Sequence, residues 1–552
     1  MPDLILASLE YGGYINIVKF IVFLVFFFLW LPLLGWVYRD AELVKTKETF
    51  WTAVVFAAGA AAILIWLLMP VFIIGLLFYI LAVGATSLGY VMHRNARVAA
   101  FQRVLTIDHI RSLFVSEEKK LEVLKDFRFI TANNNEVPVP EPKTTDFFGY
   151  KAAYDLFNDA IWKRASDIIF SPAPPNYNVA YYVDGAALKQ PPVPKEQLDY
   201  FIHFVKQLAD LDPNEKRKPQ TGKFRIYQNK VNTDWVITTA GSTVGEVVKI
   251  KQIIQENIIR LKDINLTPDQ YQQLDKIRQI KQGVFIIAGP KKSGVTTTLY
   301  AFLRSHDAFL NSIATLERHI SADMPNITQN LFSLSDTGTT SYAKKLQVIF
   351  RREPDIIGVA DCEDPETAQV ACKAAKDGKL IYLTLDADNV IKALGSWIRL
   401  VGDKKLVAHT LLGITSQRLL RKLCEHCKQA YEPNKELLKK FNIPPEKAKV
   451  LYRSGKVVYS KRGKPTTCEH CQGTGFVGRM GVFEMILMND QLRNVITQSS
   501  SLSDIATQFR RAKMLYLQEQ ALKRVVAGTT SINEMVRVLS KEKKERKPEQ
   551  KT

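Results

Sequence analysis

The stretch 283–300, GVFIIAGPKKSGVTTTLY, carries residue types that hold phosphate groups in proteins. Its apolar start predicts a buried strand, and the pattern after the glycines predicts a helix that opens at Thr296. A strand, a glycine-rich loop and a helix N-terminus form a P-loop, with the spacing glycine, four residues, glycine, lysine, then serine or threonine. Gly289 and Gly294 keep this spacing, and Thr296 stands where the magnesium-binding hydroxyl belongs. Val295 takes the place of the lysine, so the expected cradle lacks its central cation.

The missing lysine leaves two interpretations of this loop open. In the first, Lys291 or Lys292 reaches the phosphates from another backbone position, and the loop amides and threonines retain weak nucleotide or anion binding. In the second, 283–300 is a strand, a turn and a helix that bind nothing. The candidate nucleotide-binding residues are Gly289, Lys291, Lys292, Gly294, Thr296 and Thr297.

Four of the six cysteines form two CxxC pairs, which are separated by 40 residues. Four thiolates in two such knuckles make a closed tetrahedral zinc site, which is structural because no coordination position stays open. Four free thiols are the alternative, since disulfides fit a cytoplasmic protein poorly. His426 and His470 lie inside the knuckles and are expected to face solvent, whereas Cys362 and Cys372 are expected to be small core residues. The predicted zinc ligands are Cys424, Cys427, Cys468 and Cys471.

The first hundred residues are too apolar for a soluble domain. Residues 15–37 contain one charge, Lys19, and are long enough to cross a hydrocarbon layer of ~30 Å. Residues 51–92 contain no charged side chain and would form roughly 63 Å of helix, about two crossings, with Pro70 near the middle. We predict three spans, at 15–37, 51–69 and 71–92; the alternative is two spans, of which one is a long buried helix.

Charge predicts the orientation of these spans. Arg39, Lys45 and Lys47 follow the first span, and Arg94, Arg97 and Arg103 follow the last. The positive-inside rule assigns both groups to the cytoplasm, which requires three spans and an N-terminus outside. The formal charge of +20 comes partly from this flank and partly from a basic tail. Attraction to anionic lipid is the favoured interpretation of that charge, with nucleic acid as the alternative.

The rest of the chain predicts an α/β protein in several parts. Helical and alternating strand patterns mix over about 146–262, which indicates an α+β domain. Apolar strands then alternate with helices, which indicates a mainly parallel, doubly wound sheet that ends in helices at 390–401 and 405–423. The expected parts are 1–100, membrane region; 101–145, helix and linker; 146–265, α+β domain; 266–423, P-loop domain; 424–480, zinc-binding insertion; 481–540, C-terminal helices; and 541–552, basic disordered tail.

Several motifs occur in an order and spacing that resemble one known family, over about residues 147–530. They are RASDIIFSP, VDG at 183–185, GPKKSGVTTTLY, RREPDIIGVADCEDPETAQVA, TSQRLLRKLCEHC and CQGTGFVGRMGVFEM. The sequence resembles the type II secretion E-proteins and type IV pilus assembly ATPases. The resemblance implies a RecA-like ATPase domain behind an α+β N-terminal domain, a hexamer, partners in an inner-membrane platform, and a bacterial inner-membrane location with the main part in the cytoplasm. The family also has the cysteine element.

The catalytic motifs of the family are altered here. Beside Val295, the segment that normally carries a water-polarising glutamate reads LERHIS, with Glu317 kept and Arg318 and Ser321 at the later acidic positions. The segment that normally reads Gly-Glu-Ile-Arg-Asp has Asp361 as a shorter acid and Glu363 in place of the arginine. The usual histidine is Asp386, and two N-terminal-domain arginine positions align with Val236 and Lys251.

These changes lead to three hypotheses about function. Because phosphoryl transfer depends on positioned positive charge, we expect ATP turnover to be absent or very weak. The first hypothesis is therefore a membrane-anchored pseudo-ATPase, a structural or regulatory subunit in a homo- or hetero-hexamer, with structural zinc. The second is an atypical active ATPase that uses ATP and magnesium, with Asp361 as a catalytic remnant. The third, a membrane-tethered nucleic-acid binder, is disfavoured because no interleaved aromatic and basic patch is present.

Overall fold

The structure is a computed structural model, and it describes residues 17–44, 46–97, 104–105, 127–141, 144–228, 231–253, 259–333, 341–455, 457–459, 465–499 and 501–540. The expected helix within 101–127 and the basic tail at 541–552 fall wholly or mainly outside these residues.

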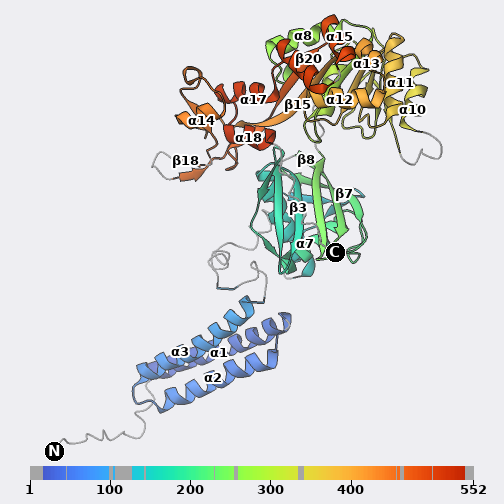
Figure 1. The fold of residues 1–552 in the computed structure, drawn as a ribbon. Coiled ribbons are helices and arrows are strands. Elements are labelled where there is room, and N and C mark those ends of the chain that lie inside the picture. The colour runs from blue at the N-terminus through green and yellow to red at the C-terminus, as the bar shows by residue number, and fades with distance from the viewer. Residues whose placement is uncertain are drawn as a thin grey trace, which may run out of the picture. The chain divides into compact units, whose positions relative to one another are not determined.

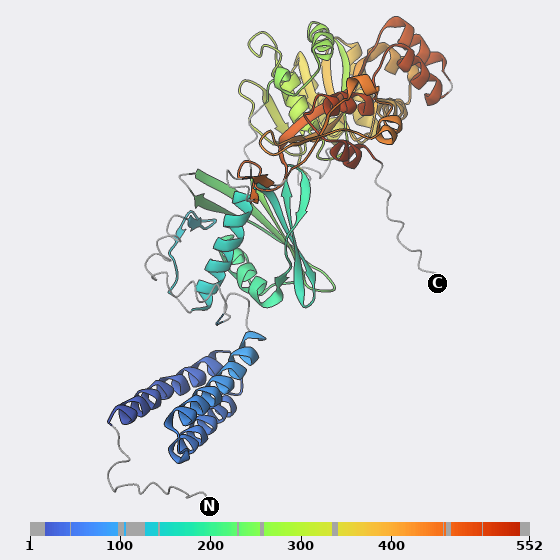
Figure 2. The ribbon, with the colours of Figure 1, turned by 90° about the vertical axis from the view of Figure 1, so that its left-hand side faces the viewer.

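Three long apolar helices lie side by side at the start of the described chain (Figure 2). They are α1 (Ile17–Leu43), α2 (Glu48–Leu68) and α3 (Phe72–Asn95), and each is long and apolar enough to cross a membrane. The stretch 51–92 forms two helices rather than one. Pro70 has no amide hydrogen and disfavours helical backbone at the residue before it, and Met69 is extended, with φ −74° and ψ 130°.

Tryptophan rings that pack on glycines and one buried ion pair hold the three helices together. A Cβ atom at Gly59 would lie 2.4 Å from the Trp30 ring, so only glycine lets α2 approach α1 here. Near the carboxyl ends of α1 and α3, Arg94 Nε lies 2.6 Å from Asp40 Oδ2, and the Tyr90 hydroxyl donates to the same oxygen at 2.6 Å. The carboxyl ends of α1 and α3 therefore lie at the same end of the bundle.

The first sheet contains nine strands in the order β2-β1-β7-β8-β9-β3-β4-β5, with β6 beside β4. Asp184 and Gly185 have φ of 50° and 77° and turn the predicted hairpin between β4 and β5. The elements are β1 (Phe127–Ile130), β2 (Glu136–Val137), α6 (Thr145–Trp162), β3 (Ala165–Ala173), β4 (Asn176–Val183), β5 (Ala186–Lys189), β6 (Val193–Pro194), α7 (Lys195–Leu208), β7 (Gln220–Gln228), β8 (Val231–Gly241) and β9 (Glu246–Ile253).

The sequence interpretation of 101–145 as helix and linker is wrong at its end. β1 pairs with β7, and β2 pairs with β1, so the sheet begins about twenty residues before the predicted start at 146. Phe127 and Phe129 are buried, whereas Arg128 and Ile130 are half-buried. An alternation of four residues between a charged segment and a Pro-rich one is too short to stand out in the sequence, and pairing with β7 is what makes it a strand.

The second sheet has seven strands in the order β12-β11-β13-β14-β10-β15-β20. Figure 1 labels its strands β15 and β20 and, in the same part of the chain, the helices α10 to α13. All neighbouring strands are parallel except β15 and β20, which are antiparallel. Its elements are α8 (Pro268–Arg278), β10 (Gly283–Ala288), α9 (Val295–Leu303), β11 (Ile313–Glu317), β12 (Thr328–Leu331), α10 (Tyr342–Phe350), β13 (Ile356–Val359), α11 (Pro365–Lys376), β14 (Leu380–Leu385), α12 (Val390–Val401), α13 (Lys404–Thr410), β15 (Leu411–Leu423) and β20 (Phe476–Leu487).

Alternate residues of β10 enter two different cores. Val284 and Ile286 pack with residues of α10 to α13 on one face, whereas Phe285 and Ile287 pack with residues of α8 and α9 on the other. Helices thus cover both faces of a mainly parallel sheet, which is the doubly wound α/β arrangement expected from the alternation of strands and helices.

Two helical predictions are wrong around the cysteine insertion. The expected helix at 405–423 ends at Thr410, and 411–423 is strand β15; the expected all-helical segment from 481 begins with the end of strand β20. The leucines of β15 repeat at a helical spacing, and this spacing wrongly predicts a helix. Tertiary pairing decides otherwise, because β15 lies between β10 and β20 and uses its backbone groups in both ladders.

Shorter elements complete the described chain. Two-stranded sheets and one helix lie between the CxxC pairs, and four helices close the chain, as the sequence indicates for 490–539. They are η2 (Leu261–Asp263), β16 (Gln429–Tyr431), α14 (Lys435–Lys440), η4 (Pro445–Lys447), β17 (Leu451–Arg453), β18 (Val457–Tyr459), β19 (Pro465–Thr467), α15 (Asp490–Gln498), α16 (Leu502–Arg511), α17 (Leu517–Val526) and α18 (Ile532–Leu539).

Candidate functional sites: the loop after β10 and the four-cysteine cluster

The loop after β10 has the backbone of a phosphate cradle. β10 is buried along its whole length and ends at Ala288, and α9 begins seven residues later. Gly294 precedes the helix with φ 86°, a left-handed conformation that suits glycine. The predicted residues from Gly289 to Thr297 are thus brought together on one loop and the first turn of one helix. Unpaired amides of a helix N-terminus attract anions.

Val295 is the first residue of α9, and its side chain turns back onto the loop. It packs against the core between α8, α9 and β10. A Cβ atom at Gly289 would lie 3.0 Å from Val295 Cγ2 and 2.3 Å from Ser293 Oγ. An apolar side chain therefore lies beside the first glycine of the cradle.

Lys291 and Lys292 are both exposed on the loop. Lys292 has φ 68°, which is unusual for a residue with a side chain and costs on the order of 1–2 kcal/mol. A strained lysine at this point supplies a positive charge to the loop, although not at the position where the P-loop spacing places its lysine.

Gln417, on β15, is a site residue that sequence reasoning missed. Its Nε2 donates to the Ser293 carbonyl oxygen at 2.9 Å, which ties the loop to the neighbouring strand. Ser293, Ser416 and Gln417 are all buried, and each has a side-chain oxygen without a hydrogen-bond partner among the described residues. The TSQRLL motif contains Gln417, but nothing in its pattern indicates contact with a loop 124 residues earlier.

Asp361 follows β13 at the carboxyl edge of the sheet, with φ 53°. Its amide donates to Thr384 Oγ1 at 2.7 Å. Although Asp361 reaches the surface, partial desolvation raises the pKa of its carboxyl group, Glu363 raises it further, and Arg318 and Lys291 lower it. Positive charge from Lys291 thus reaches the one acid that the sequence marks as a catalytic remnant.

Glu317 ends strand β11 with its side chain fully buried. Tyr300 donates to one carboxylate oxygen at 2.5 Å, and Thr315 and Gln329 donate to the other at 2.6 and 3.3 Å. Burial and the contact with Glu317 raise the pKa of Tyr300, so its hydroxyl stays protonated. Three donors occupy this carboxylate, which leaves it poorly placed to polarise a water molecule. Asp386, at the predicted histidine position, follows β14 and is exposed.

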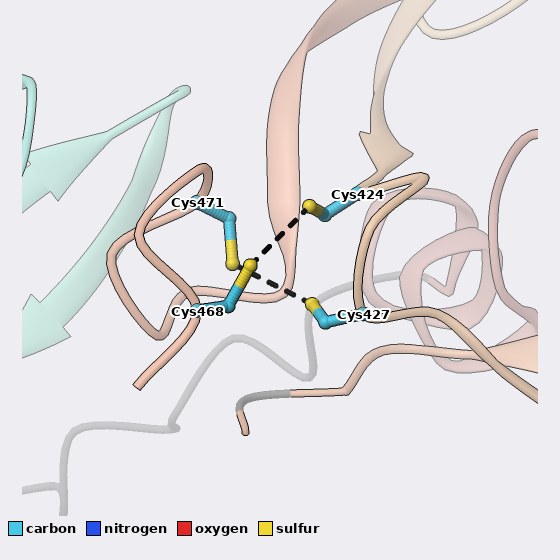
Figure 3. A group of neighbouring side chains, drawn as sticks. All are labelled: Cys424, Cys427, Cys468 and Cys471. Atoms are coloured by element: carbon cyan, nitrogen blue, oxygen red, sulfur yellow. Dashed lines mark hydrogen bonds between the residues drawn. The ribbon is translucent and has the colours of Figure 1, made fainter. Parts of the chain in front are cut away.

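Four cysteines from two loops converge at the far end of the β15–β20 ribbon (Figure 3). The two CxxC loops follow β15 and precede β20, and their sulfur atoms all lie within 4.8 Å of one another. The Cys424 and Cys468 sulfurs are 3.9 Å apart, and those of Cys427 and Cys471 are 3.6 Å apart. Four sulfurs at about 2.3 Å from one zinc ion would be about 3.8 Å apart, so the cluster fits a tetrahedral metal.

The surroundings of the cluster hold the sulfurs in place. All four cysteines are buried, and the Gly475 amide donates to Cys471 Sγ at 3.3 Å. His426 and His470 are exposed with ring centroids 4.2 Å apart, so they face solvent as expected and stand outside the ligand set. Cys362 and Cys372 are buried in the core of the second sheet, which confirms the expectation for them.

Comparisons with known proteins agree with the motifs. The model of the family described as "Type II/IV secretion system protein" matches residues 150–537. The type IV pilus assembly ATPase PilB of Thermus thermophilus is 27% identical over 425 residues, which cover 77% of this chain and 46% of that protein. This chain therefore spans about half the length of that relative. The type II secretion system ATPase E of Vibrio cholerae is 30% identical over 386 residues, which cover 69% of this chain and 74% of that protein.

Solved structures with a similar fold include the ATPase DotB of Legionella pneumophila, with TM-score 0.48 and 16% identity over 72% of this chain and 96% of that one. The pilus retraction motor PilT with bound ADP gives TM-score 0.43 and 17% identity, over 69% and 95%. The family match over most of the chain and the 30% identity to the Vibrio protein confirm the resemblance predicted from the motifs. The chain belongs to the type II/IV secretion system protein family, which includes the type II secretion E-proteins and the type IV pilus assembly ATPases.

Proposed function

We propose that this chain is a membrane-anchored, non-hydrolysing subunit of a secretion or pilus machine, with a structural or regulatory role. The observation that carries the proposal is Val295, which starts α9 where the P-loop spacing requires lysine and is half-buried against the core. The backbone that would surround phosphate is retained, while the cation that would neutralise it is replaced by an apolar side chain.

The loop has lost positive charge that phosphoryl transfer needs. Transferring a phosphoryl group requires donors that stabilise spread negative charge, and losing one such donor typically lowers the rate by about 10²–10³. Here the lysine is absent, and Glu317 is buried with three hydrogen bonds to its carboxylate. Such losses are not additive, but none restores another.

Weak binding of nucleotide or another anion is compatible with this role. The loop amides and the hydroxyls of Thr296 and Thr297 lie at a helix N-terminus, which favours negative charge. Lys291 and Lys292 add positive charge at the loop surface. Bound nucleotide would then act as a structural ligand that stabilises the loop rather than as a fuel.

Zinc is the proposed resident metal. Four buried thiols whose sulfur atoms lie within 4.8 Å of one another suit zinc better than magnesium or calcium, which prefer oxygen ligands. A site with four protein ligands has no open position for water, so the metal would stabilise the end of the β15–β20 ribbon without catalysis.

The three apolar helices are the proposed anchor in a bacterial inner membrane. The contact between Asp40 and Arg94 supports a three-span arrangement, since the basic residues after α1 and after α3 then lie on one side. With the main part in the cytoplasm, the chain would join a homo- or hetero-hexamer, in the second case with an active ATPase, next to inner-membrane platform proteins.

The test uses the full chain purified in detergent with zinc. We expect no magnesium-dependent phosphate release above background, and weak binding of a fluorescent ATP analogue. Val295→Lys is expected to raise nucleotide affinity about tenfold or more, because one charge-assisted contact to phosphate contributes ~1.5–3 kcal/mol. Val295→Leu, which keeps an apolar side chain, is the matched control and is expected to leave the affinity unchanged.

A slow ATPase is the second candidate, and the electrostatic influence of Lys291 on Asp361 favours it. In that case the native chain would release phosphate with magnesium, and Thr296→Ala and Lys291→Ala would each abolish the release. This result would overturn the non-hydrolysing proposal while leaving the anchor and the zinc cluster untouched.

A further inference from the structure

Two adjacent apolar side chains stand out on the surface of the second sheet's domain. Phe309 is 87% exposed and Leu310 is 81% exposed, in the loop between α9 and β11. Among described residues outside α1 to α3, the other exposed large apolar side chains reach at most 60%. An exposed pair of this size usually marks an interaction site.

The loop is held in one conformation by hydrogen bonds. Asp307 Oδ1 accepts from the Phe309 amide at 2.8 Å, and the Asp307 carbonyl accepts from the Leu310 and Asn311 amides. On one side, Arg278 donates to the Ser305 carbonyl oxygen, and on the other, the Ser312 amide donates to Asp355 Oδ2 at 2.8 Å. The two apolar side chains are therefore presented on a fixed turn and do not belong to a frayed segment.

Basic residues outnumber acidic residues around the loop, by six to four. Strands β10, β11, β13 and β14 are parallel, so the segments before them, 279–282, 304–312, 351–355 and 376–379, lie at the same amino edge of the sheet. Two of the acids, Asp307 and Asp355, use a carboxylate oxygen to accept a backbone amide. These segments hold the basic residues Lys281, Arg304, Arg351, Arg352, Lys376 and Lys379, and the acidic residues Asp307, Glu353, Asp355 and Asp377.

We propose that this amino edge docks on an anionic membrane surface, with Phe309 and Leu310 inserted at the boundary between lipid headgroups and acyl chains. Apolar side chains flanked by basic ones suit that boundary, because the apolar groups enter the acyl region while the cations meet anionic headgroups. The proposal deepens the proposed membrane anchoring and rests on it.

The covalent tether makes such a small contact sufficient. Two apolar residues with a modest excess of positive charge bind a bilayer weakly by themselves. When α1 to α3 hold the chain at the bilayer, the second contact becomes intramolecular and benefits from a high effective concentration of lipid. A second copy of the chain is a poorer occupant, since a stable protein interface buries about 800 Å² on each partner and two side chains supply far less.

The experiment places a probe beside the pair in the full chain. Ser312 is exposed, and the native cysteines are buried, so Ser312→Cys can be labelled selectively with an environment-sensitive fluorophore. The labelled chain is reconstituted in vesicles of phosphatidylcholine alone or with phosphatidylglycerol. We expect a blue shift, and quenching by acyl-chain nitroxide lipids, when phosphatidylglycerol is present. Phe309→Ser with Leu310→Ser is expected to lower the lipid-bound population of the loop about tenfold or more.

The matched control is Val231→Ser with Val244→Ser, which removes two exposed valines elsewhere and is expected to leave the signal unchanged. No lipid quenching with phosphatidylglycerol, or an equal signal without it, would overturn the proposal. A signal in detergent that grows with protein concentration would assign the pair to a second copy, and a signal that needs an added protein would assign it to that protein; either result also refutes membrane docking. Flotation of the vesicles after alkaline extraction tests the anchor separately, so its failure is distinguishable.

Discussion

The loop after β10 contacts strand β15 at Gln417, and the four-cysteine cluster begins directly after the end of the same strand. The two sites nevertheless keep different parts of the chemistry expected of them. The loop keeps its backbone, with Gly294 in the left-handed conformation, and lacks the cation at position 295. The cluster keeps every ligand atom, with the sulfurs at a spacing that suits one metal ion. Backbone geometry can persist without the side chain that does the chemistry, because strand and helix packing hold the loop. A metal site has no such independence, because its side chains are the site.

The largest expected effect comes from removing a cysteine. Cys427→Ser should abolish stoichiometric zinc and loosen the segment between the two knuckles, because structural zinc contributes on the order of 10 kcal/mol to small metal domains. Metal analysis and hydrogen exchange of residues 424–475 measure this. Cys372→Ser, at a buried cysteine in the main core, is the control and should retain full zinc content. Full zinc in Cys427→Ser would show that the cluster is not the metal site.

The second prediction concerns Glu534, which clamps the ribbon between the two sites. Burial alone would raise the pKa of Glu534, but hydrogen bonds from Arg537 and Arg421 outweigh it and lower the pKa to about 2. A lowered pKa stabilises the fold above the ordinary glutamate value of 4.5, and this stabilisation is lost as the pH falls from there towards 2. We expect Glu534 to contribute roughly 3 kcal/mol of the pH-dependent stability.

Denaturant unfolding of the full chain in detergent at pH 6 and at pH 3 measures this contribution, with Glu534→Gln as the variant whose stability should change less between the two. Glu436→Gln, on the exposed start of α14, serves as the control carboxylate. An equal loss of stability in native chain and Glu534→Gln would contradict the assignment.

The third prediction tests how the loop is held without its cation. Gln417→Ala removes the donor to the Ser293 carbonyl, and a buried acceptor left without a partner costs ~1–3 kcal/mol. We expect amide exchange over 289–296 to accelerate about tenfold while zinc content stays constant. Gln498→Ala, at an exposed glutamine of α15, should have no effect. Unchanged exchange in Gln417→Ala would mean that the loop needs no contact with β15.

The smallest effect is expected at Lys292. The φ of Lys292 is 68°, which glycine adopts without steric cost. Glycine also loses more conformational entropy on folding, which offsets part of this gain. We therefore expect Lys292→Gly to stabilise the fold by less than ~1 kcal/mol. Lys291→Gly, next to it, has no such relief and should destabilise. If Lys292 serves anion binding, Lys292→Gly will weaken binding while it raises the melting temperature. A lower melting temperature for Lys292→Gly would show that the backbone conformation of Lys292 does not destabilise the native chain.

Local patterns predicted much of the fold. The strand of β10, the three apolar helices and the hairpin at Asp184 each follow from residue spacing that acts over a few neighbours. Sequence patterns miss strands β1 and β15 because their strand partners are distant in the chain. Phe129 pairs with Ile226, 97 residues away, and Ile287 pairs with Thr415, 128 residues away. The candidate nucleotide residues were found as a set, but the contact of Gln417 with the loop was not, since it also joins distant segments.

The family, the grouping of four cysteines proposed as metal ligands and the absence of the P-loop lysine could all be predicted from the sequence, because they depend on which side chains stand at which positions. The tertiary structure was needed to show that Val295 is half-buried against the core, that Glu317 is surrounded by donors, and that Phe309 and Leu310 are presented on a fixed turn. Residue type sets what a side chain can do, whereas burial and hydrogen-bond partners, which come from elements far apart in the chain, set whether it is free to do it.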